Sequence, residues 1–434
     1  MKAAVIGAGW AGAAAAYQLH KKGINTTVFE ASHTIGGRAR KHSSKTLQQV
    51  VDNGQHLLLG AYSSTLALMQ ELQIDLDRSF YRFDLDIQSA DESFRFKTAP
   101  LPAPFHLLGP LLFAKGTRFS ERLALIGLQS YLRKNHWKVP SGMTVLALLQ
   151  HTKQPEVLIK KLWHPLCIAA LNTPIDQACA QLFSHVLRDS LGGSRGDTQM
   201  LIPLQNMTEL WADRALRHAD VRLGRAVRSL IQVSSGYELN GEHFDAVIIA
   251  TNTPSAIRLM HPLVSDRQQR EFVRALSQIS FNPIATLYLQ PESAWENPYP
   301  MLMLDEDTQG LAAGQWVFNH AAMPGSALQN IIAVTISYAN RLLDYDKKAI
   351  ESAIIKQINA QSQVALPPLL SSELITEKRA TFVASPCLVR PDLHTPWPTL
   401  FLAGDWIAND YPAVLEGAVR SGLAAANALY SSLY

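Results

Sequence analysis

The chain of 434 residues is poor in cysteine, in charge and in long apolar runs. Its three cysteines lie far apart and form no Cys-x-x-Cys pair, so neither a zinc site nor a redox dithiol is indicated. Charged residues make up 17% of the sequence, below the roughly 25% of an average soluble domain. The net charge of +3 comes without a dense stripe of lysine and arginine, which argues against nucleic acid as a partner.

Two further absences bear on where the protein resides. No run of about 18 apolar residues occurs, so a membrane-spanning helix is not expected. The first apolar run begins at residue 3, which leaves no room for a signal peptide. Few and scattered cysteines suit a reducing compartment. We therefore expect a cytoplasmic protein.

A glycine motif at the start of the chain carries most of the functional information. Gly7, Gly9 and Gly12 form Gly-x-Gly-x-x-Gly directly after the apolar run Ala3–Ile6. Gly7 permits a tight turn out of a strand, Gly9 lets a pyrophosphate approach the backbone, and Gly12 lets the next helix pack closely on the strand. This order of strand, turn and helix predicts an adenine dinucleotide site.

The residues after the motif supply two more contacts for a dinucleotide. A helix expected over 10–22 would offer the N–H groups of its first turn, which includes Trp10 and Ala11, to the phosphates. Glu30 closes the next apolar run, where a carboxylate can accept hydrogen bonds from the adenosine ribose. A carboxylate there also repels a 2′-phosphate, which argues against NADP. The alternative for Glu30 is a solvated strand end.

A second short motif, Gly36, Gly37 and Arg38, follows Glu30. Together the two motifs resemble the flavoproteins with two dinucleotide-binding domains, in which this segment passes the pyrophosphate. The resemblance implies FAD rather than NAD, with Arg38 or Arg40 giving charge-assisted hydrogen bonds to phosphate.

A polar loop is expected beside the flavin ring. Asp52 and Asn53 precede Gly54, Gln55 and His56. Gly54 would let the backbone approach a planar ring, and Gln55 and His56 would present polar groups beside it. Asp52 and Asn53 would orient the loop. For His56 the alternative is a hydrogen-bonded core histidine.

The C-terminal end completes the expected flavin site. Gly404 and Asp405 follow an apolar strand, where a carboxylate can accept hydrogen bonds from ribityl hydroxyls or orient the pyrophosphate through water. The last helix, expected over 412–430, would direct its positive dipole end at the flavin. The cofactor contacts expected at its start are Glu416, Gly417 and Ala418. The alternative is a plain amphipathic helix.

These motifs resemble the flavin amine oxidase and phytoene desaturase superfamily from end to end of the chain. Two segments, 52–60 and 163–174, are more similar to the hydroxysqualene dehydroxylases, or squalene-associated FAD-dependent desaturases, of bacterial hopanoid and squalene synthesis. The segment 201–205 departs from the usual pattern of that group around its proline. By the same resemblance, the backbone of Val227 would hydrogen-bond adenine.

The resemblance implies a reductive reaction on an isoprenoid lipid. An allylic hydroxyl leaves as water, and carbon receives a hydride from reduced FAD. Ionisation of the alcohol needs a proton donor, for which His56 is the candidate, and an apolar cavity that tolerates a cation. Aromatic walls could stabilise that cation. The candidates for them are Trp163, Tyr62 and Tyr411.

Three other functions stay open at this point. Carotenoid or phytoene desaturation uses the same fold in the oxidative direction, amine oxidation would need a polar, aromatic amine site, and a flavin-bound scaffold would have no activity. Only one dinucleotide fingerprint occurs, since the glycines at 192–196 lack a strand and a helix around them. An external electron donor is therefore expected to reduce the FAD.

The expected architecture is α/β, with a Rossmann-like FAD-binding domain interleaved with an α+β substrate domain. The strand and helix patterns place cofactor segments at both ends and in the middle of the chain. The expected FAD-binding parts are 1–60, 205–256 and 391–434, and the substrate parts are the mostly helical 61–204 and the sheet and helix of 257–390.

One stretch of the helical insert, 99–132, is suited to a lipid surface. Its apolar residues are broken by proline and glycine, with basic residues at the edges, so it could dip into one leaflet on the inner face of the cytoplasmic membrane. The alternative is a pair of core helices around a substrate tunnel. The residues concerned are Phe105, Leu107, Leu108, Leu111, Leu112 and Phe113, with Lys115, Arg118, Arg122 and Arg133 beside them.

Overall fold

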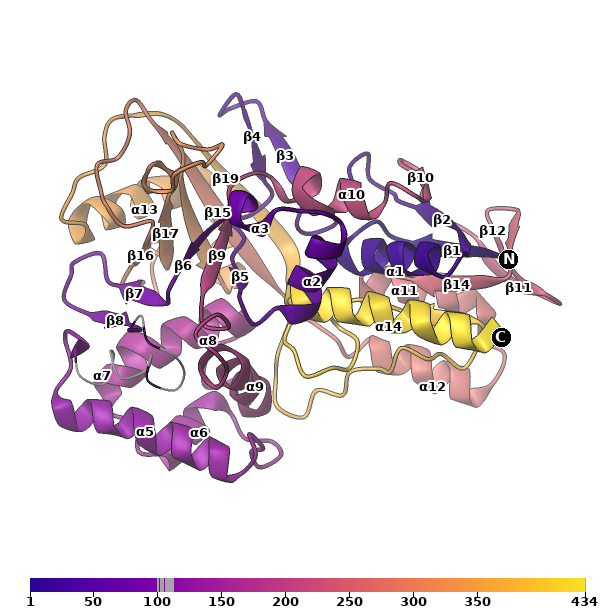
Figure 1. Ribbon diagram of the computed structural model, residues 1–434, viewed down its shortest axis with the longest axis horizontal. Coiled ribbons are helices and arrows are strands. Elements are labelled where there is room, and N and C mark those ends of the chain that lie inside the picture. The colour runs from indigo at the N-terminus through magenta and orange to yellow at the C-terminus, as the bar shows by residue number, and fades with distance from the viewer. Residues whose placement is uncertain (100, 102–104, 106–112, 434) are drawn as a thin grey trace.

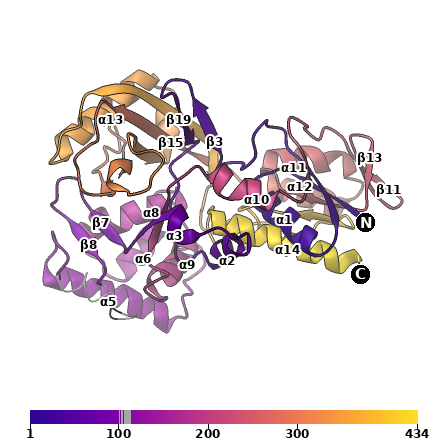
Figure 2. The same cartoon turned by 45° about the horizontal axis from the view of Figure 1, so that its top comes forward.

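The chain has two parts that lie side by side, with both termini at the same end of the molecule (Figure 1). The computed structural model describes residues 1–99, 101, 105 and 113–433. One part is built on a parallel sheet, and the other combines an antiparallel sheet with a group of helices. The two parts stay side by side when the molecule is turned (Figure 2).

The first part is built on a five-stranded parallel sheet in the order β10-β2-β1-β14-β20. Its strands come from three distant regions of the chain, as expected for an interleaved α/β protein. The sequence patterns predict all five of these strands within a few residues, and this sheet confirms the α/β class. The strands are β1 (Lys2–Ile6), β2 (Asn25–Phe29), β10 (Asp220–Arg222), β14 (Ala246–Ile249) and β20 (Leu400–Leu402).

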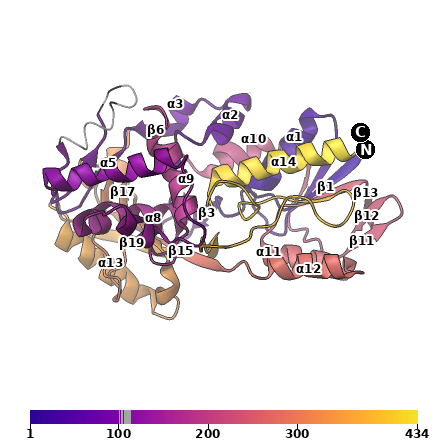
Figure 3. The same cartoon turned by 90° about the horizontal axis from the view of Figure 1, so that it is seen from below.

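Helices cover both faces of this sheet because its buried strands are apolar on both faces. Ala3 and Val5 of β1 pack with α1 (Trp10–Lys21) and α14 (Leu415–Leu433), while Ala4 and Ile6 face the opposite layer. That layer consists of α11 (Thr253–Met260) and α12 (Arg267–Leu276), as Figure 3 shows.

A three-stranded meander connects β10 to β14. It comprises β11 (Leu230–Val233), β12 (Gly236–Leu239) and β13 (Glu242–Phe244). The sequence predicts a strand over 226–233, which is wrong for the first half of that range. There the Asn240 side chain accepts hydrogen bonds from the backbone of Arg228 and Ser229 at 2.9 and 3.3 Å, so these N–H groups are not available to a sheet.

The second part contains a five-stranded antiparallel sheet in the order β16-β17-β18-β15-β19. Its two long strands, β15 (Phe281–Pro291) and β19 (Leu369–Phe382), pair over most of their length. One face packs on α13 (Lys347–Gln361), and the other turns toward the helical group. The remaining strands are β16 (Met301–Met303), β17 (Trp316–Asn319) and β18 (Ile332–Ser337).

The segment expected to be mostly helical also contains strands, because short strands with long-range partners leave little local signal. β5 (Leu58–Leu59), β9 (Met200–Pro203) and β6 (Phe80–Phe83) form one sheet, and β7 (Asp86–Gln88) pairs with β8 (Arg95–Lys97). The helices of this region are α2 (Ser63–Glu71), α3 (Leu76–Ser79), α5 (Phe119–Lys134), α6 (Val145–His151), α7 (Glu156–Leu158), α8 (His164–Leu171) and α9 (Ala180–Leu191).

Most of the apolar residues that we expect at a lipid surface cannot be placed. Leu107, Leu108, Leu111 and Leu112 lie outside the described residues. Phe105 and Phe113 are described, and both side chains are exposed. In the part of the chain that the structure describes, no helix combines the length and the apolar character needed to cross a bilayer.

The close approach of α1 and α14 generates a stability prediction. A Cβ atom at Gly422 would overlap the carbonyl oxygen of Ala11, so Gly422→Ala should destabilise the protein by about 1–3 kcal/mol through overpacking. Gly127→Ala in α5 is the matched control, because a Cβ atom there meets nothing within 4 Å. The control should raise stability by up to ~1 kcal/mol through helix propensity. Thermal unfolding of both variants checks the prediction, and a stabilising Gly422→Ala would contradict it.

Candidate functional site

One large cavity of about 1330 Å³ runs from the glycine motif to an apolar wall formed by the second part of the chain. It exceeds the roughly 300–1,000 Å³ of typical small-molecule sites, which leaves room for a dinucleotide and a second ligand together. Residues from the N-terminal, middle and C-terminal regions line it.

The glycine end of the cavity has the close backbone approach that a pyrophosphate needs. Gly7 has a φ of +109°, and a Cβ atom on Gly37 would lie 2.9 Å from the Cα atom of Gly9. Trp10 and Ala11 line the cavity at the start of α1. Gly12 does not line it, because this glycine packs against the carbonyl oxygen of Gly7. The first turn of α1 contains no acidic residue, so its N–H groups suit an anion.

Glu30 is anchored at the wall of the cavity by two backbone groups. Its Oε2 atom accepts a hydrogen bond from the Ala8 N–H at 2.8 Å, and its Oε1 atom accepts one from Ser32 at the same distance. A carboxylate has about four acceptor positions, so each oxygen keeps one for a ribose hydroxyl. Val227 lines the same cavity. These positions fit the adenosine half of a dinucleotide.

Arg38 and Asp405 form an ion pair at the wall of the cavity. The Nη2 atom of Arg38 lies 2.5 Å from Oδ1 of Asp405, and Nη1 donates to the Ala380 carbonyl at 2.7 Å. Burial acts to lower the pKa of Arg38, but the adjacent carboxylate outweighs it and holds that pKa above its usual value. The Nη1 atom of Arg40 lies 3.9 Å from Oε2 of Glu377, a longer distance than that between Arg38 and Asp405. The charge of Arg40 is therefore less neutralised than that of Arg38 and is better placed to bind a phosphate.

The loop of Gly54, Gln55 and His56 lies between β4 (Gln49–Asp52) and β5 and lines the same cavity. The Gln55 amide donates to the carbonyl of His56, and its oxygen lies 3.0 Å from Nε2 of His320. His320 follows β17, and no local motif marks it as a site residue, because its contact with Gln55 spans 265 positions of the chain.

His56 is held in its neutral form. Burial lowers the pKa of His56 to about 4, so at pH 7 roughly one molecule in a thousand carries the second proton. Its Nε2 atom is enclosed and has no hydrogen-bond partner among the described residues. His56 is therefore not a ready acid in the resting protein, and a donor role requires that a proton be brought to it.

The C-terminal motif divides between the cavity and the core. Gly404, Asp405 and Ala418 line the cavity, but Glu416 and Gly417 do not. The position of Glu416 corrects the expectation that it contacts the cofactor. This fully buried carboxylate caps the N-terminus of α2, where it accepts hydrogen bonds from the N–H groups of Ser64 at 3.0 Å and Thr65 at 2.8 Å.

The far end of the cavity is apolar and aromatic. Tyr62 and Tyr411 line the large cavity, as expected, but Trp163 does not. Trp163 packs behind Phe183, with ring centroids 6.3 Å apart, and its indole N–H donates to Gln154. The wall is instead formed by Leu85, Ile87, Phe183, Met301, Trp316 and Phe318.

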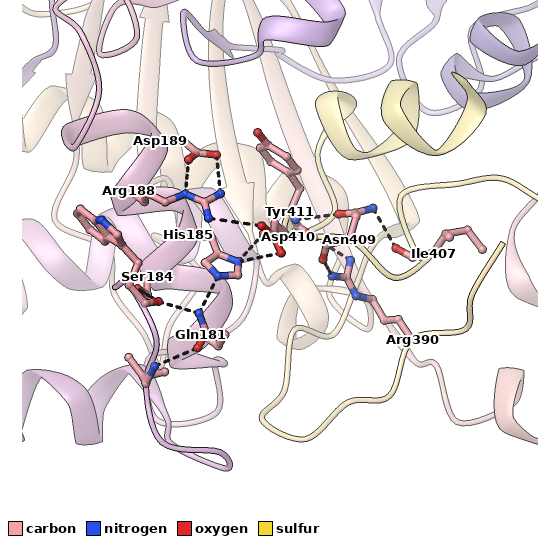
Figure 4. A network of polar contacts seen from close by, with 12 residues as sticks. Gln181, Ser184, His185, Arg188, Asp189, Arg390, Ile407, Asn409, Asp410 and Tyr411 are labelled. Atoms are coloured by element: carbon pink, nitrogen blue, oxygen red, sulfur yellow. Dashed lines mark hydrogen bonds and ion pairs between the residues drawn. The ribbon is translucent and has the colours of Figure 1, made fainter. Parts of the chain in front are cut away.

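Polar contacts join the helical wall of the cavity to the loop that precedes α14 (Figure 4). His185 of α9 lies 3.0 Å from the Asp410 carbonyl, and Arg188 lies 3.4 Å from the Asp410 carboxylate. Arg390 donates to the carbonyls of Asn409 and Tyr411 from the other side. The loop of Asp405 is therefore held from both parts of the molecule.

This arrangement predicts a role for Arg390 in cofactor retention. Arg390→Ala would remove the donor to the carbonyls of Asn409 and Tyr411 and loosen the loop that carries Asp405. We expect a lower melting temperature and a lower ratio of bound flavin to protein after purification. Arg267→Ala is the control, since its partner is an exposed Glu271 one helical turn away. Equal flavin content in both variants would contradict the prediction.

Comparisons with known proteins agree with this geometry. The family model described as flavin containing amine oxidoreductase matches residues 10–430. The hydroxysqualene dehydroxylases of Rhodopseudomonas palustris and Zymomonas mobilis are each 28% identical to the chain, over 98% of it and 97% of their own length. Cyclohexylamine oxidase from Brevibacterium oxydans has a similar fold, with a TM-score of 0.71 and 17% identity over 100% of this chain and 99% of that one.

Proposed function

The chain belongs to the flavin containing amine oxidoreductase family and is an FAD-dependent oxidoreductase, and from this premise we propose that it reduces hydroxysqualene to squalene with loss of water. The large cavity carries the proposal, because the residues expected to bind a dinucleotide and a set of apolar side chains line the same space. Two relatives of matching length carry the name of this activity. The hopanoid or squalene pathway is part of the proposal.

The residues around the apolar end suit the ionisation of an allylic alcohol. When bound, reduced FAD supplies a hydride. The aromatic side chains of Tyr62, Phe183 and Tyr411 would stabilise positive charge on the substrate and keep water away from it. His56 would pass a proton to the leaving oxygen, provided that the imidazole receives one from elsewhere.

The cofactor positions are also part of the proposal. Glu30 and Val227 would bind the adenosine half of FAD, and Gly7, Gly9 and the start of α1 would bind the pyrophosphate. The positive side chains of Arg38 and Arg40 would neutralise the negative charge of the phosphates through charge-assisted hydrogen bonds. The expected domain boundaries at residues 60, 204, 256 and 390 follow from the same assignment and stay proposals.

Product analysis tests the proposed reaction. Purified holoenzyme with chemically reduced flavin should convert hydroxysqualene to squalene, and His56→Ala should retain FAD and lose turnover. NADPH alone should leave the flavin oxidised, because we propose a separate electron donor. Conjugated products from phytoene with oxidised flavin, and no squalene from hydroxysqualene, would contradict the proposal in favour of a desaturase. Full turnover by His56→Ala would remove only the donor role.

We further propose that the protein binds the cytoplasmic face of an anionic membrane. Three exposed apolar side chains of α5 lie three or four residues apart and therefore share one helical face. Exposed basic residues beside them suit anionic headgroups. The apolar residues are Phe119, Leu123 and Ile126, joined by Phe105 and Phe113, and the basic residues are Lys115, Arg118, Arg133 and Lys134.

Vesicle co-sedimentation tests the membrane proposal. The protein should bind phosphatidylglycerol vesicles more tightly than phosphatidylcholine vesicles, and added salt should weaken the binding. Phe113→Glu should reduce vesicle affinity by about tenfold or more, since a buried phenyl ring contributes about 1.5–3 kcal/mol. Val389→Glu is the matched control, because Val389 is 80% exposed and Phe113 81% exposed. An equal loss of vesicle affinity in Phe113→Glu and Val389→Glu would contradict the proposal that the face around α5 binds the membrane.

A further inference from the structure

A second cavity of about 370 Å³ adjoins the loop of Gly54, Gln55 and His56. These three residues line both cavities, so the loop is the wall between them. The second cavity has exposed residues at its rim, among them Gln205 and Glu209. Buried side chains, including His320, lie at its base. It therefore leads from the protein surface to the back of the loop.

The hydrogen bonds at the base of this cavity have a fixed direction. The Gln55 oxygen can only accept, so Nε2 of the neutral His320 ring carries the proton and donates to it at 3.0 Å. Nδ1 is then an acceptor and takes the hydrogen bond of the Ser326 hydroxyl at 3.0 Å, while Ser326 Oγ accepts from the Leu328 N–H at 3.1 Å. Burial lowers the pKa of His320 to about 4, so its imidazole ring is neutral at pH 7. This series of hydrogen bonds from Ser326 through His320 fixes the Gln55 side chain, and the His320 ring within it does not titrate near neutral pH.

Asp52 is the acidic side chain placed between the rim and the loop. Its carboxylate accepts hydrogen bonds from the Met207 N–H at 3.0 and 3.2 Å. Burial raises the pKa of Asp52 to about 7; the Met207 N–H opposes this rise, and the negative charge of Glu209 adds to it. The Lys41 ammonium on the adjacent strand lies 3.0 Å from Glu209, and the Tyr288 hydroxyl donates to the backbone carbonyl of Asp52.

Other ionisable groups near Asp52 do not replace it in this role. His320 is neutral and already donates to Gln55, and His56 is neutral at pH 7. Glu373, beyond Tyr288 in the sheet, binds His42 and Ser44. The pKa of Glu209 is lowered by Lys41 and Asn206, so Asp52 is the carboxyl group in the lining of the second cavity whose pKa lies near neutrality.

We propose that the second cavity is the proton entry of this enzyme, in which Asp52 takes a proton from water and passes it across the cavity to His56, which lines the same cavity and delivers it to the leaving oxygen. The proposal rests on the proposed function. In each turnover the substrate C–O bond breaks, and its electron pair stays on oxygen, which takes the proton and leaves as water. The carbon forms a C–H bond with the hydride, so one proton and one hydride are consumed.

This supply route accounts for the state of His56. An imidazolium with a pKa of about 4 is a stronger acid than an ordinary histidine but is scarce at pH 7. A neighbouring group that is half protonated at neutral pH can load it during turnover. Asp52 does not line the large cavity, so it acts through His56 and does not touch the substrate.

The pH dependence of turnover tests the proposal in the holoenzyme. With chemically reduced flavin, kcat for hydroxysqualene should be highest below pH 7 and fall as Asp52 loses its proton above that pH. Asp52→Asn should lower kcat by about 10²-fold with little change in KM, and the fall above pH 7 should vanish. Asp52→Glu should restore part of the rate and the descending limb, which a merely structural role would not do.

An infrared titration gives a readout that is independent of turnover. Without substrate, the wild-type holoenzyme should show the carbonyl stretch of a protonated carboxylic acid that disappears near pH 7, and Asp52→Asn should lack it. Asp213→Asn is the matched control, because burial raises the pKa of Asp213 as well, yet this residue lines neither cavity. The control should keep the infrared band, the rate and the pH profile.

The outcomes separate the two proposals. Wild-type rate and pH profile in Asp52→Asn, with squalene formed, would overturn the proton entry and leave the proposed function intact. Absence of the band in the wild-type protein would also overturn it. Absence of squalene from the wild-type holoenzyme at every pH would contradict the proposed function, and the proton entry would fall with it.

Discussion

The ion pair between Arg38 and Asp405 is the contact on which the arrangement of the site depends. It joins a loop near the N-terminus to a loop near the C-terminus, and the second bond of Arg38 reaches the Ala380 carbonyl at the end of β19. The side chain of Asp405 is only 5% exposed. Removing one partner of such a pair leaves a buried charge at a cost of about 3–5 kcal/mol. Arg38, Asp405 and Ala380 all line the large cavity, so this contact ties the two parts of the molecule together at its wall.

The cavity keeps two kinds of chemistry apart along its length. Its polar end uses backbone N–H groups and the anchored carboxylate of Glu30, which suit a dinucleotide. Its far end is aromatic and aliphatic, which suits an isoprenoid chain. The loop of Gly54, Gln55 and His56 lies where the large cavity meets the second, smaller one. FAD-dependent reduction of an apolar alcohol fits this division, since hydride and proton would reach the substrate from different neighbours.

The sequence predicts well what depends on neighbouring residues. The glycine motif, the helix α1 and the apolar strands β1 and β14 are set by local patterns. No local pattern predicts the long strand β19, because its sequence is polar and its partner β15 lies far away in the chain. The expected cofactor contact of Glu416 is wrong, because the orientation of this residue on its helix, which spacing alone does not show, turns its carboxylate toward α2. His320 reaches Gln55 only in the folded chain, so no sequence signal could have revealed it.

The bound-flavin content of Arg38 variants tests the central claim most directly. Arg38→Met should lose FAD and lower the melting temperature, whereas the double variant with Asp405→Asn should recover the melting temperature and still lack FAD. That result would mean that the pair stabilises the fold by mutual neutralisation and also forms the cofactor site. Full FAD content and unchanged melting temperature in Arg38→Met would contradict the account.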